Sequence, residues 1–215
     1  MKKNRVMLWG GTILILVVAV GGAIWIANRD GGGDVTTIEN LIRAEDHVKG
    51  SASAMVVVTE YSDFQCPACK TYYPVIQTLA EEYGDKVAFV YRHFPLPQHQ
   101  HAKRAAYAAE AAGKQGKFWE MHDKIFDNQD AWSRAESAEG IFLGYARELG
   151  LDEDAFAQDS ASDETAIRVK KDLEEGRQAR INATPTFFIN GSKIESPRSY
   201  DEFKRIISER TAKTQ

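Results

Sequence analysis

The sequence predicts an α/β domain that contains a helical insertion and follows one N-terminal transmembrane helix. Three observations carry this prediction. Runs typical of β-strands, each accompanied by a helix-like run, lie on both sides of a long central stretch. The central stretch itself shows only helical periodicity. An uncharged apolar run stands near the N-terminus.

The composition fits one globular domain with an insertion and gives no sign of a nucleic-acid-binding protein. The chain has 215 residues, and 43% of them are hydrophobic, which can support a core. Its 27 basic and 31 acidic residues are mixed along the chain, without a basic stripe. We therefore expect no nucleic-acid partner.

The N-terminal apolar run predicts a membrane anchor at residues 6–28. Val6–Ala27 holds 22 residues without a charge, which is long enough to cross a bilayer as a helix. Trp9 and Trp25 lie near its ends, and tryptophan is enriched at membrane interfaces. The basic residues within 1–5 predict a short cytoplasmic end and an extracytoplasmic remainder. A cleaved signal peptide is the alternative, because small residues in the run offer a cleavage site.

Residues 29–50 are expected to be a linker and an N-terminal arm. Asp30–Asp34 contains three successive glycines and predicts a flexible tether. Thr37–Lys49 carries polar residues around a few apolar ones. Its pattern leaves open a short helix or an extended arm.

The first part of the domain, residues 51–97, is organised around a Cys-Pro-Ala-Cys motif at residues 66–69, which holds both cysteines of the chain. Ala54–Tyr61 leads into the motif as a continuous apolar strand, and Lys70–Tyr83 leads away as a helix. A second strand is predicted at Val87–Phe94. A Cys-x-x-Cys motif at a strand-to-helix junction is typical of a dithiol that cycles with a disulfide.

The position of the motif favours redox chemistry. The free N–H groups and the macrodipole at a helix N-terminus favour an anion, so we expect thiolate character at Cys66. A thiolate is the attacking species in thiol–disulfide exchange. A structural staple is one alternative, but so short a loop constrains the unfolded chain by only about 2 kcal/mol. A zinc site is another, but the sequence holds no second cysteine pair to complete four ligands.

Glu60 stands at the end of the first strand, six residues before Cys66. One interpretation is a strand-end side chain that faces solvent. The other is a buried carboxylate beneath the dithiol, which takes the proton of Cys69 and has a pKa raised by desolvation. The sequence leaves both interpretations open.

Residues 98–181 are predicted to form the helical insertion. His99 and His101, at its start, are expected to be solvated loop histidines, with a place at the rim of the active site as the alternative. His122 is expected to pack or cap. The predicted segments are helices at Ala102–Ala112, Phe118–Phe126, Gly140–Leu149 and Glu164–Ile181, and an acidic turn at Asp152–Phe156.

Residues 182–215 return to strand and helix and are predicted to complete the α/β domain. Thr186–Ile189 has strand character, and the Asn-Gly pair after it is a strong hairpin signal. A further strand is expected at Ser192–Glu195, and a closing helix at Ser199–Arg210.

Four segments, in this order, resemble the DsbA-like disulfide oxidoreductases of the thioredoxin superfamily. They are Asp46–Gly50, Tyr61–Cys69 around the motif, Gly116–Asp123 and Ala183–Phe187. The first of them is similar to the lead-in of membrane-anchored, BdbD-like bacterial members. The resemblance runs from about Ile38 to the end of the chain and implies a thioredoxin fold.

The resemblance implies a role for each matching residue. Cys66 would be the exposed nucleophile that forms mixed disulfides, and Cys69 would be the buried resolving thiol. Pro185 would be the cis-proline opposite the dithiol, and Glu60 falls at the buried-acid position. The residues expected to border bound substrate are Thr184, Pro67 and Ala68.

Ala68 departs from the pattern of the best-known oxidant of the family, which has histidine directly before the second cysteine. Alanine cannot donate a hydrogen bond to the Cys66 thiolate, so the resemblance does not by itself imply a strong oxidant.

The expected function is the introduction of disulfides into extracytoplasmic proteins by the Cys66–Cys69 pair, at the cell membrane of a bacterium. No cofactor or metal is expected besides this redox-active disulfide. The expected partners are unfolded or reduced secreted proteins and a membrane thiol oxidase, which the resemblance implies to be DsbB-like or vitamin-K-epoxide-reductase-like (VKOR-like). The alternatives are an extracytoplasmic disulfide reductase, and a membrane-tethered chaperone or binding module with incidental cysteines.

Overall fold

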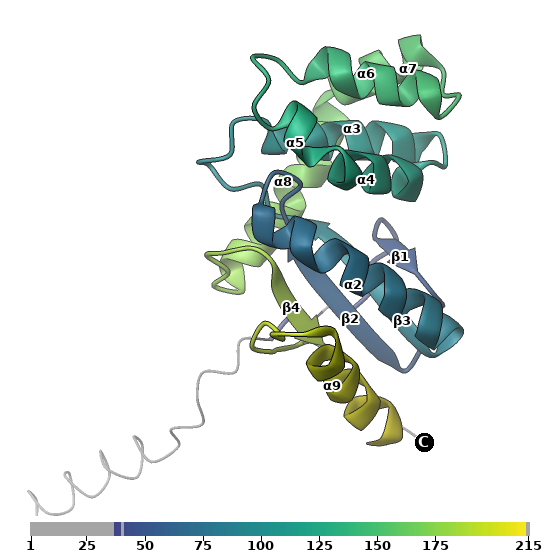
Figure 1. Cartoon of the computed structure of the whole chain (residues 1–215), viewed down its shortest axis with the longest axis vertical. Helices are drawn as coiled ribbons and strands as arrows, with labels where there is room; N and C mark the ends of the chain where they lie inside the picture. The colour runs from purple at the N-terminus through teal and green to yellow at the C-terminus, as the bar shows by residue number, and fades with distance from the viewer. Residues whose placement is uncertain (1–36, 40, 214–215) are drawn as a thin grey trace, which may run out of the picture. The chain divides into compact units, whose positions relative to one another are not determined.

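The computed structural model describes residues 37–39 and 41–213, and in them the chain forms a five-stranded sheet. The strands are β1 (His47–Lys49), β2 (Val56–Ser62), β3 (Val87–His93), β4 (Thr186–Ile189) and β5 (Ser192–Lys193). Their order across the sheet is β1-β3-β2-β4-β5. β2 and β3 are parallel, and each other neighbouring pair is antiparallel (Figure 1).

The two central strands are buried along their whole length. Every residue of β2 and of β3 is buried, as the continuous apolar runs in the sequence predict. The predicted strands at both positions are confirmed within one or two residues. The hairpin between β4 and β5 is also confirmed, and Asn190 and Gly191 both have positive φ, at 47° and 80°.

Helices cover both faces of the sheet. α2 (Pro67–Tyr83) and α9 (Tyr200–Lys213) lie on one face, where Leu79, Phe203 and Ile207 pack fully buried against β2 and β4. α8 (Asp163–Gln178) packs beside β3 on the opposite face, and the residues just after it contact Tyr61. The predicted helices at these three places are confirmed.

The insertion between β3 and β4 is helical, as predicted. Besides α8 it contains α3 (Ala102–Lys114), α4 (Phe118–Asp127), α5 (Gln129–Trp132), α6 (Glu139–Glu148) and α7 (Glu153–Ser160). The alanines of α3 are buried, and their small side chains let α4, α7 and α8 pack closely around it. Figure 1 shows these helices grouped beyond one end of the sheet.

One prediction in the insertion was wrong, and one helix was not predicted. The acidic turn at Asp152–Phe156 is the start of the eight-residue helix α7. The Asp152 side chain caps this helix by accepting a hydrogen bond from the backbone N–H of Ala155, and Phe156 anchors it in the core. The short helix α5 follows directly after α4 and gave no separate periodic signal.

The N-terminal arm is extended rather than helical. Thr37 forms a bridge with Ser192, and β1 pairs with β3 at the edge of the sheet. The sheet therefore begins before residue 51, where the first part of the domain was predicted to start.

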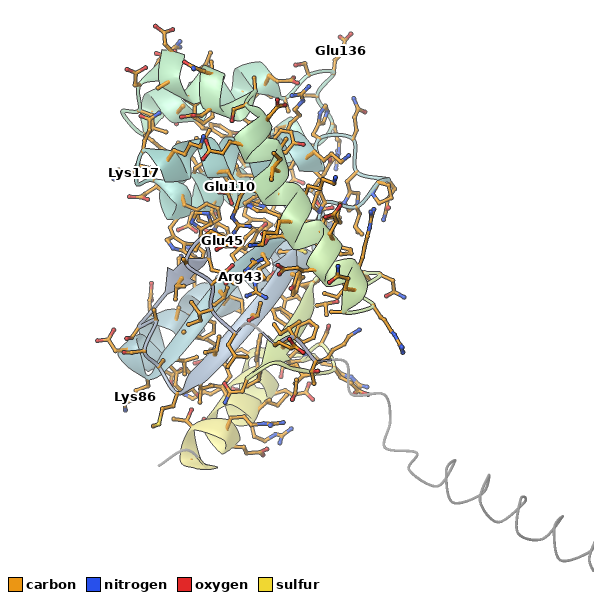
Figure 2. All side chains as sticks on the ribbon, turned by 180° about the vertical axis from the view of Figure 1, so that it is seen from behind. Arg43, Glu45, Lys86, Glu110, Lys117 and Glu136 are labelled. Atoms are coloured by element: carbon orange, nitrogen blue, oxygen red, sulfur yellow. The ribbon has the colours of Figure 1, made fainter. Side chains whose placement is uncertain are left out.

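Buried ion pairs fix the arm to α8 and β3. The Asp46 carboxylate accepts hydrogen bonds from Arg43 and Arg92, and both carboxylate and guanidinium groups are almost fully buried. Asp172 of α8 pairs with Arg43 and also accepts a hydrogen bond from the backbone N–H of His93, at 3.0 Å. Figure 2 shows Arg43 and Glu45 next to this helix.

The predicted membrane anchor at residues 6–28, the cytoplasmic end at 1–5 and the glycine-rich tether lie outside the described residues. Among the residues that the structure describes, no helix is both long and apolar enough to cross a membrane.

Candidate active site

The Cys-Pro-Ala-Cys motif lies where β2 gives way to α2. Cys66 is the N-cap of α2 and has an extended backbone, with φ −72° and ψ 123°. Pro67 takes the first helical position, which suits proline because it has no N–H to leave unpaired. Cys69 then falls on the first turn and faces the core. The local sequence thus places one thiol at the helix terminus and the other beneath it.

Cys66 is less exposed than predicted. Its exposed fraction is 6%, and that of Cys69 is 0%. The expectation of an exposed nucleophile was wrong because the loop before β4 lies against the thiol. The Cys66 thiol donates a hydrogen bond to the carbonyl oxygen of Thr184, at 3.3 Å. The neighbouring Pro67 and Ala68 are exposed, so the surface next to Cys66 is open to a partner.

The loop that covers Cys66 contains the predicted cis-proline. The Thr184–Pro185 peptide bond is cis, which confirms that prediction. Thr184 is 9% exposed, and its side chain lies within hydrogen-bond reach of Cys66. The fold thus brings the dithiol and this loop together across 118 positions of sequence.

The pKa values of the two thiols are shifted in opposite directions. A hydrogen bond from the Cys69 thiol lowers the pKa of Cys66 to about 5, although partial burial opposes this. Hydrogen bonds from the Thr184 side chain and from the backbone N–H groups of Cys69 and Ala68 also lower it. Burial raises the pKa of Cys69 well above its ordinary value, and the hydrogen bond to Cys66 and the charge of Glu60 raise it further. Near neutral pH, Cys66 is a thiolate and Cys69 is a thiol.

Glu60 is a buried carboxyl group, and the interpretation as a solvent-facing side chain was wrong. Its exposed fraction is 9%. In the sheet it lies opposite Tyr91 of β3 and Phe187 of β4. Burial raises the pKa of Glu60 to about 7, the charge of Cys66 adds to this rise, and a hydrogen bond from Ser62 opposes it.

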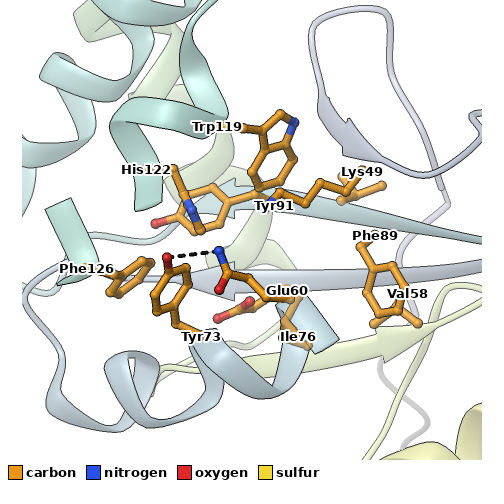
Figure 3. Close-up of a pocket in the computed structure, with 12 residues that line it drawn as sticks. Lys49, Val58, Glu60, Tyr73, Ile76, Phe89, Tyr91, Trp119, His122 and Phe126 are labelled. Atoms are coloured by element: carbon orange, nitrogen blue, oxygen red, sulfur yellow. Dashed lines mark hydrogen bonds between the residues drawn. The ribbon is translucent and has the colours of Figure 1, made fainter. Parts of the chain in front are cut away.

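Glu60 lines a pocket between α2, α4 and the sheet. Figure 3 shows Tyr73, His122 and Phe126 toward one end of the pocket and Lys49 toward the other, with Glu60 below. His122 is 6% exposed, and burial lowers its pKa to about 4, so the imidazole is neutral near pH 7. The expectation that His122 packs is confirmed. The other lining residues are Val58, Ile76, Gln77, Phe89, Val90, Tyr91 and Trp119.

Asp63 shapes the segment between β2 and the dithiol, and the sequence analysis did not single it out. Its buried carboxylate accepts hydrogen bonds from the backbone N–H of Gln65, at 2.7 Å, and of Leu96, at 2.8 Å. A third bond joins it to Nδ1 of His99, at 2.7 Å. An aspartate two residues before its N–H partner is a known turn pattern and was the available signal.

The loop that carries His99 and His101 contacts the segment before the dithiol, and the prediction of a solvated side chain was wrong for His101. His101 is 5% exposed, and its ring bonds to the carbonyl oxygen of Ala135, at 2.8 Å. The backbone N–H of His101 donates to the side chain of Gln65, at 2.6 Å. The loop therefore holds the segment that leads into Cys66.

The arrangement supplies the groups that thiol–disulfide exchange needs. Cys66 offers an attacking or leaving thiolate, Cys69 a buried partner, and Glu60 a carboxyl group that titrates near neutral pH. The two cysteines are not bridged in this structure. Within residues 37–39 and 41–213, no group of three His, Cys, Asp or Glu side chains is placed to hold a metal.

Comparison with known families and curated proteins gives two kinds of match. The model of a family described as Thioredoxin matches residues 43–209. The Na(+)/H(+) antiporter NhaA 3 of Salinispora tropica is 39% identical over 163 residues, which cover 75% of this chain and 24% of that protein. The Na(+)/H(+) antiporter NhaA 1 of Mycolicibacterium vanbaalenii is 41% identical over 157 residues, which cover 71% and 24%. The chain thus spans about a quarter of the length of these curated relatives.

The chain also matches solved structures of similar fold, and each match covers almost the whole length of the solved chain. The Wolbachia pipientis alpha-DsbA1 structure has a TM-score of 0.73 and 23% identity, over 81% of this chain and 94% of that one. The oxidised BdbD of Bacillus subtilis has a TM-score of 0.68 and 27% identity, over 78% and 93%. Pseudomonas aeruginosa DsbA2 has a TM-score of 0.63 and 28% identity, over 78% and 95%.

Proposed function

This chain belongs to the thioredoxin family, and we propose that it is a DsbA-like thiol–disulfide oxidoreductase that introduces disulfides into protein substrates through Cys66 and Cys69. One observation carries the proposal: Cys66 is the N-cap of α2 and lies against the cis-proline loop, with Cys69 fully buried one turn further on. This position lowers the pKa of Cys66 and raises that of Cys69. A dithiol whose reduced form is stabilised as a thiolate is a good oxidant.

The reaction begins with the oxidised pair and a reduced substrate. A substrate thiolate attacks the Cys66 sulfur, a new sulfur–sulfur bond forms, and the Cys66–Cys69 bond breaks. Cys69 leaves with the electron pair and takes up a proton. A second substrate thiolate then attacks the substrate sulfur of the mixed disulfide and releases Cys66 as a thiolate. The substrate dithiol has lost two electrons, and the cysteine pair has gained them.

Glu60 fits the role of proton donor and acceptor for Cys69. A group with a pKa of about 7 can give or take a proton near neutral pH, whereas an ordinary glutamate stays ionised. The charge of Glu60 acts on Cys69, so the two groups are close enough to influence each other. In this proposal, protonated Glu60 supplies the proton when Cys69 leaves as a thiolate.

Substrates meet the protein on the face formed by Pro67, Ala68 and the Thr184–Pro185 loop. Pro67 and Ala68, which follow Cys66 directly, are exposed, and the carbonyl oxygen of Thr184 lies 3.3 Å from the Cys66 sulfur. We propose unfolded or reduced extracytoplasmic proteins as the substrates. A membrane thiol oxidase then restores the disulfide. The predicted anchor at residues 6–28 supports a bacterial membrane location with this domain outside the cytoplasm.

The test is oxidation of a reduced, unfolded protein that contains several cysteines. The oxidised full-length chain, added in stoichiometric amount, is expected to transfer its disulfide and to be recovered with both cysteines reduced. With a disulfide-bonded substrate, the Cys66 thiolate of the Cys69→Ser variant is expected to attack the substrate disulfide, release one substrate thiolate and accumulate as the mixed disulfide, and Cys66→Ser is expected to accumulate almost none. Equal trapping by both variants would contradict the assignment of the nucleophile.

The double variant Cys66→Ser/Cys69→Ser separates the proposal from the chaperone alternative. An oxidoreductase loses its effect on disulfide formation in this variant. A chaperone with incidental cysteines keeps its ability to suppress aggregation of the same unfolded protein. A reductase would instead be recognised by a reduction potential of the Cys66–Cys69 pair at or below that of thioredoxin, about −270 mV.

A further inference from the structure

Gln129 of the insertion contacts the backbone of the segment that carries Cys66. It is the first residue of α5 and is 4% exposed. Its side-chain Nε2 donates hydrogen bonds to the carbonyl oxygen of Phe64, at 2.7 Å, and of Cys66, at 3.1 Å. The two acceptors flank Gln65, so a single amide group spans the segment just before the first turn of α2.

We propose that Gln129 is a positioning residue of the dithiol: it holds the Cys66 main chain in the orientation that aims the N–H groups of Ala68 and Cys69 at the Cys66 sulfur. The proposal rests on the proposed function, in which the Cys66 thiolate is the exchanging group. It assigns to the helical insertion a direct part in setting the redox properties of the dithiol.

The main chain at Cys66 must keep its orientation because the hydrogen bonds that stabilise the Cys66 thiolate depend on the direction of their donors. The backbone N–H groups of Ala68 and Cys69 lower the pKa of Cys66. Their effect requires that Cys66 keep its extended N-cap conformation. Preorganised donors stabilise a charge far better than donors that must reorient when the charge forms. A fixed carbonyl at Cys66 fixes the peptide plane that leads into this turn.

The amide of Gln129 acts from a rigid support. The next buried side chain along α5, Trp132, is 0% exposed, and its Nε1 donates to the carbonyl oxygen of Ile125 in α4, at 2.8 Å. The backbone N–H of Ser133 donates to the carbonyl oxygen of Gln129, at 2.9 Å. These two hydrogen bonds therefore fix the corner between α4 and α5, where Gln129 lies.

A second contact joins the same two parts of the molecule. The Gln65 side-chain Nε2 donates to the carbonyl oxygen of Ser133, at 3.0 Å. Gln129 thus donates to the active-site segment, and Gln65 of that segment donates back to the residue at the end of α5. Of the two contacts, only that of Gln129 reaches the carbonyl of Cys66 itself.

The chain offers a matched control for a substitution at Gln129. Gln115, elsewhere in the insertion, also uses its amide to hold a backbone. Its Nε2 donates to the carbonyl oxygen of Asp152, at 3.1 Å, and its Oε1 accepts from the backbone N–H of Asp152, at 2.9 Å. Loss of this clamp touches no group near the dithiol.

The experiment compares Gln129→Leu, Gln129→Asn and Gln115→Leu with the unsubstituted full-length chain. Two quantities are measured: the ultraviolet absorbance of the Cys66 thiolate against pH, and the equilibrium constant with glutathione. Gln129→Leu is expected to raise the Cys66 pKa and to make the pair at least threefold less oxidising, which is about 14 mV. Gln129→Asn keeps the amide but is one methylene shorter, so it is expected to fall between. Gln115→Leu is expected to change neither quantity.

The outcomes separate the role of Gln129 from the proposed function. A folded Gln129→Leu variant with the unsubstituted thiolate titration and glutathione constant would overturn the inference and leave Gln129 a purely structural residue. If Gln129→Leu does not fold, Gln129→Asn decides in the same way. An ordinary thiol pKa in the unsubstituted chain would instead count against the proposed function itself, and the role of Gln129 would fall with it.

Discussion

At the scale of single residues, the difference between the two thiols determines the chemistry. Cys66 and Cys69 are three positions apart, yet one has a lowered pKa and the other a raised pKa. Burial alone would raise both pKa values. The pKa of Cys66 is lowered instead because the Cys69 thiol and the N-terminus of α2 supply hydrogen bonds to its sulfur.

This difference predicts how alkylation of the reduced protein depends on pH. Cys66 has a pKa of about 5, so its reaction rate with iodoacetamide is expected to stay nearly constant from about pH 8 to pH 6 and to fall below that. Cys69→Ala removes the side-chain hydrogen bond to the Cys66 sulfur, so the midpoint of the Cys66 titration in this variant is expected at higher pH. Mass spectrometry of the alkylated peptides checks the site. A rate that climbs steadily to about pH 9 would show an ordinary thiol.

Replacing Ala68 by histidine is expected to make the protein a stronger oxidant. A histidine at this position could donate a hydrogen bond to the Cys66 thiolate, which alanine cannot do. Ala68→His is expected to lower the Cys66 pKa and to make the reduction potential more positive by tens of millivolts, at about 30 mV for each pKa unit. A glutathione titration of both forms measures this. An unchanged or more negative potential would mean that the helix terminus and Glu60 set the potential without help from position 68.

Glu60 predicts an unusual dependence of stability on pH. Its pKa is about 7 in the folded protein and 4.5 ordinarily, so the folded state disfavours the charged form. The stability contribution is therefore fully present below about pH 4.5 and is lost as pH rises through 7. Glu60→Gln removes this loss, so the variant is expected to be more stable at about pH 8, by on the order of 3 kcal/mol, with a smaller gain near pH 5. Urea unfolding at both pH values measures the gain, and an equal gain at both would contradict the raised pKa.

The sequence allowed the reacting groups to be predicted, but not the groups that hold them. Cys66, Cys69 and Pro185 lie in short motifs that can be recognised locally. Gln129 could not be predicted because its acceptor at Phe64 lies 65 positions away. Cys66 was expected to be exposed because the local motif does not reveal the loop that covers it.

At the scale of secondary-structure elements, buried ion pairs hold the N-terminal arm in addition to apolar contacts. Although burial opposes ionisation of Asp46, hydrogen bonds from Arg92 and Arg43 lower its pKa. The polar pattern of Thr37–Lys49 left helix and extended arm open, because its partners on β3 and α8 lie far along the chain. The regular apolar patterns of α2, α3 and β2, in contrast, predicted these elements closely.

Asp46 accordingly predicts a large loss of stability on substitution. Asp46→Asn leaves the buried Arg43 and Arg92 facing a neutral group, and breaking a buried pair in this way typically costs 3–5 kcal/mol. Because the pKa of Asp46 is lowered, the contribution is present above about pH 4 and is lost as pH falls, so the two proteins are expected to converge in acid. Chemical unfolding at several pH values tests this.

The exposed pair Arg205–Glu209 supplies the control for this prediction. Its side chains are more than half exposed, and such surface pairs contribute little. Glu209→Gln is expected to change stability by less than about 1 kcal/mol. A similar effect of both substitutions would contradict a special role for the buried pairs.

At the scale of the whole molecule, two distant parts of the sequence build one sheet, and the insertion between them reaches back to the dithiol. β2, β3 and α2 come from before the insertion, and β4, β5 and α9 come from after it. The contrast between strand-rich ends and a helical middle was enough to predict this division. The way the insertion contacts the active-site segment depends on tertiary packing, which single-sequence patterns do not contain.

The central claim is that Cys66 and Cys69 form an oxidising pair, and its reduction potential tests this most directly. Thioredoxin has a nucleophilic thiol of pKa about 7 and a potential of about −270 mV. The Cys66 pKa of about 5 is two units lower. At about 30 mV per pKa unit, we predict a potential tens of millivolts more positive than that of thioredoxin, measured by a glutathione titration of the purified full-length chain. A value at or below about −270 mV would contradict the account and identify a reductant.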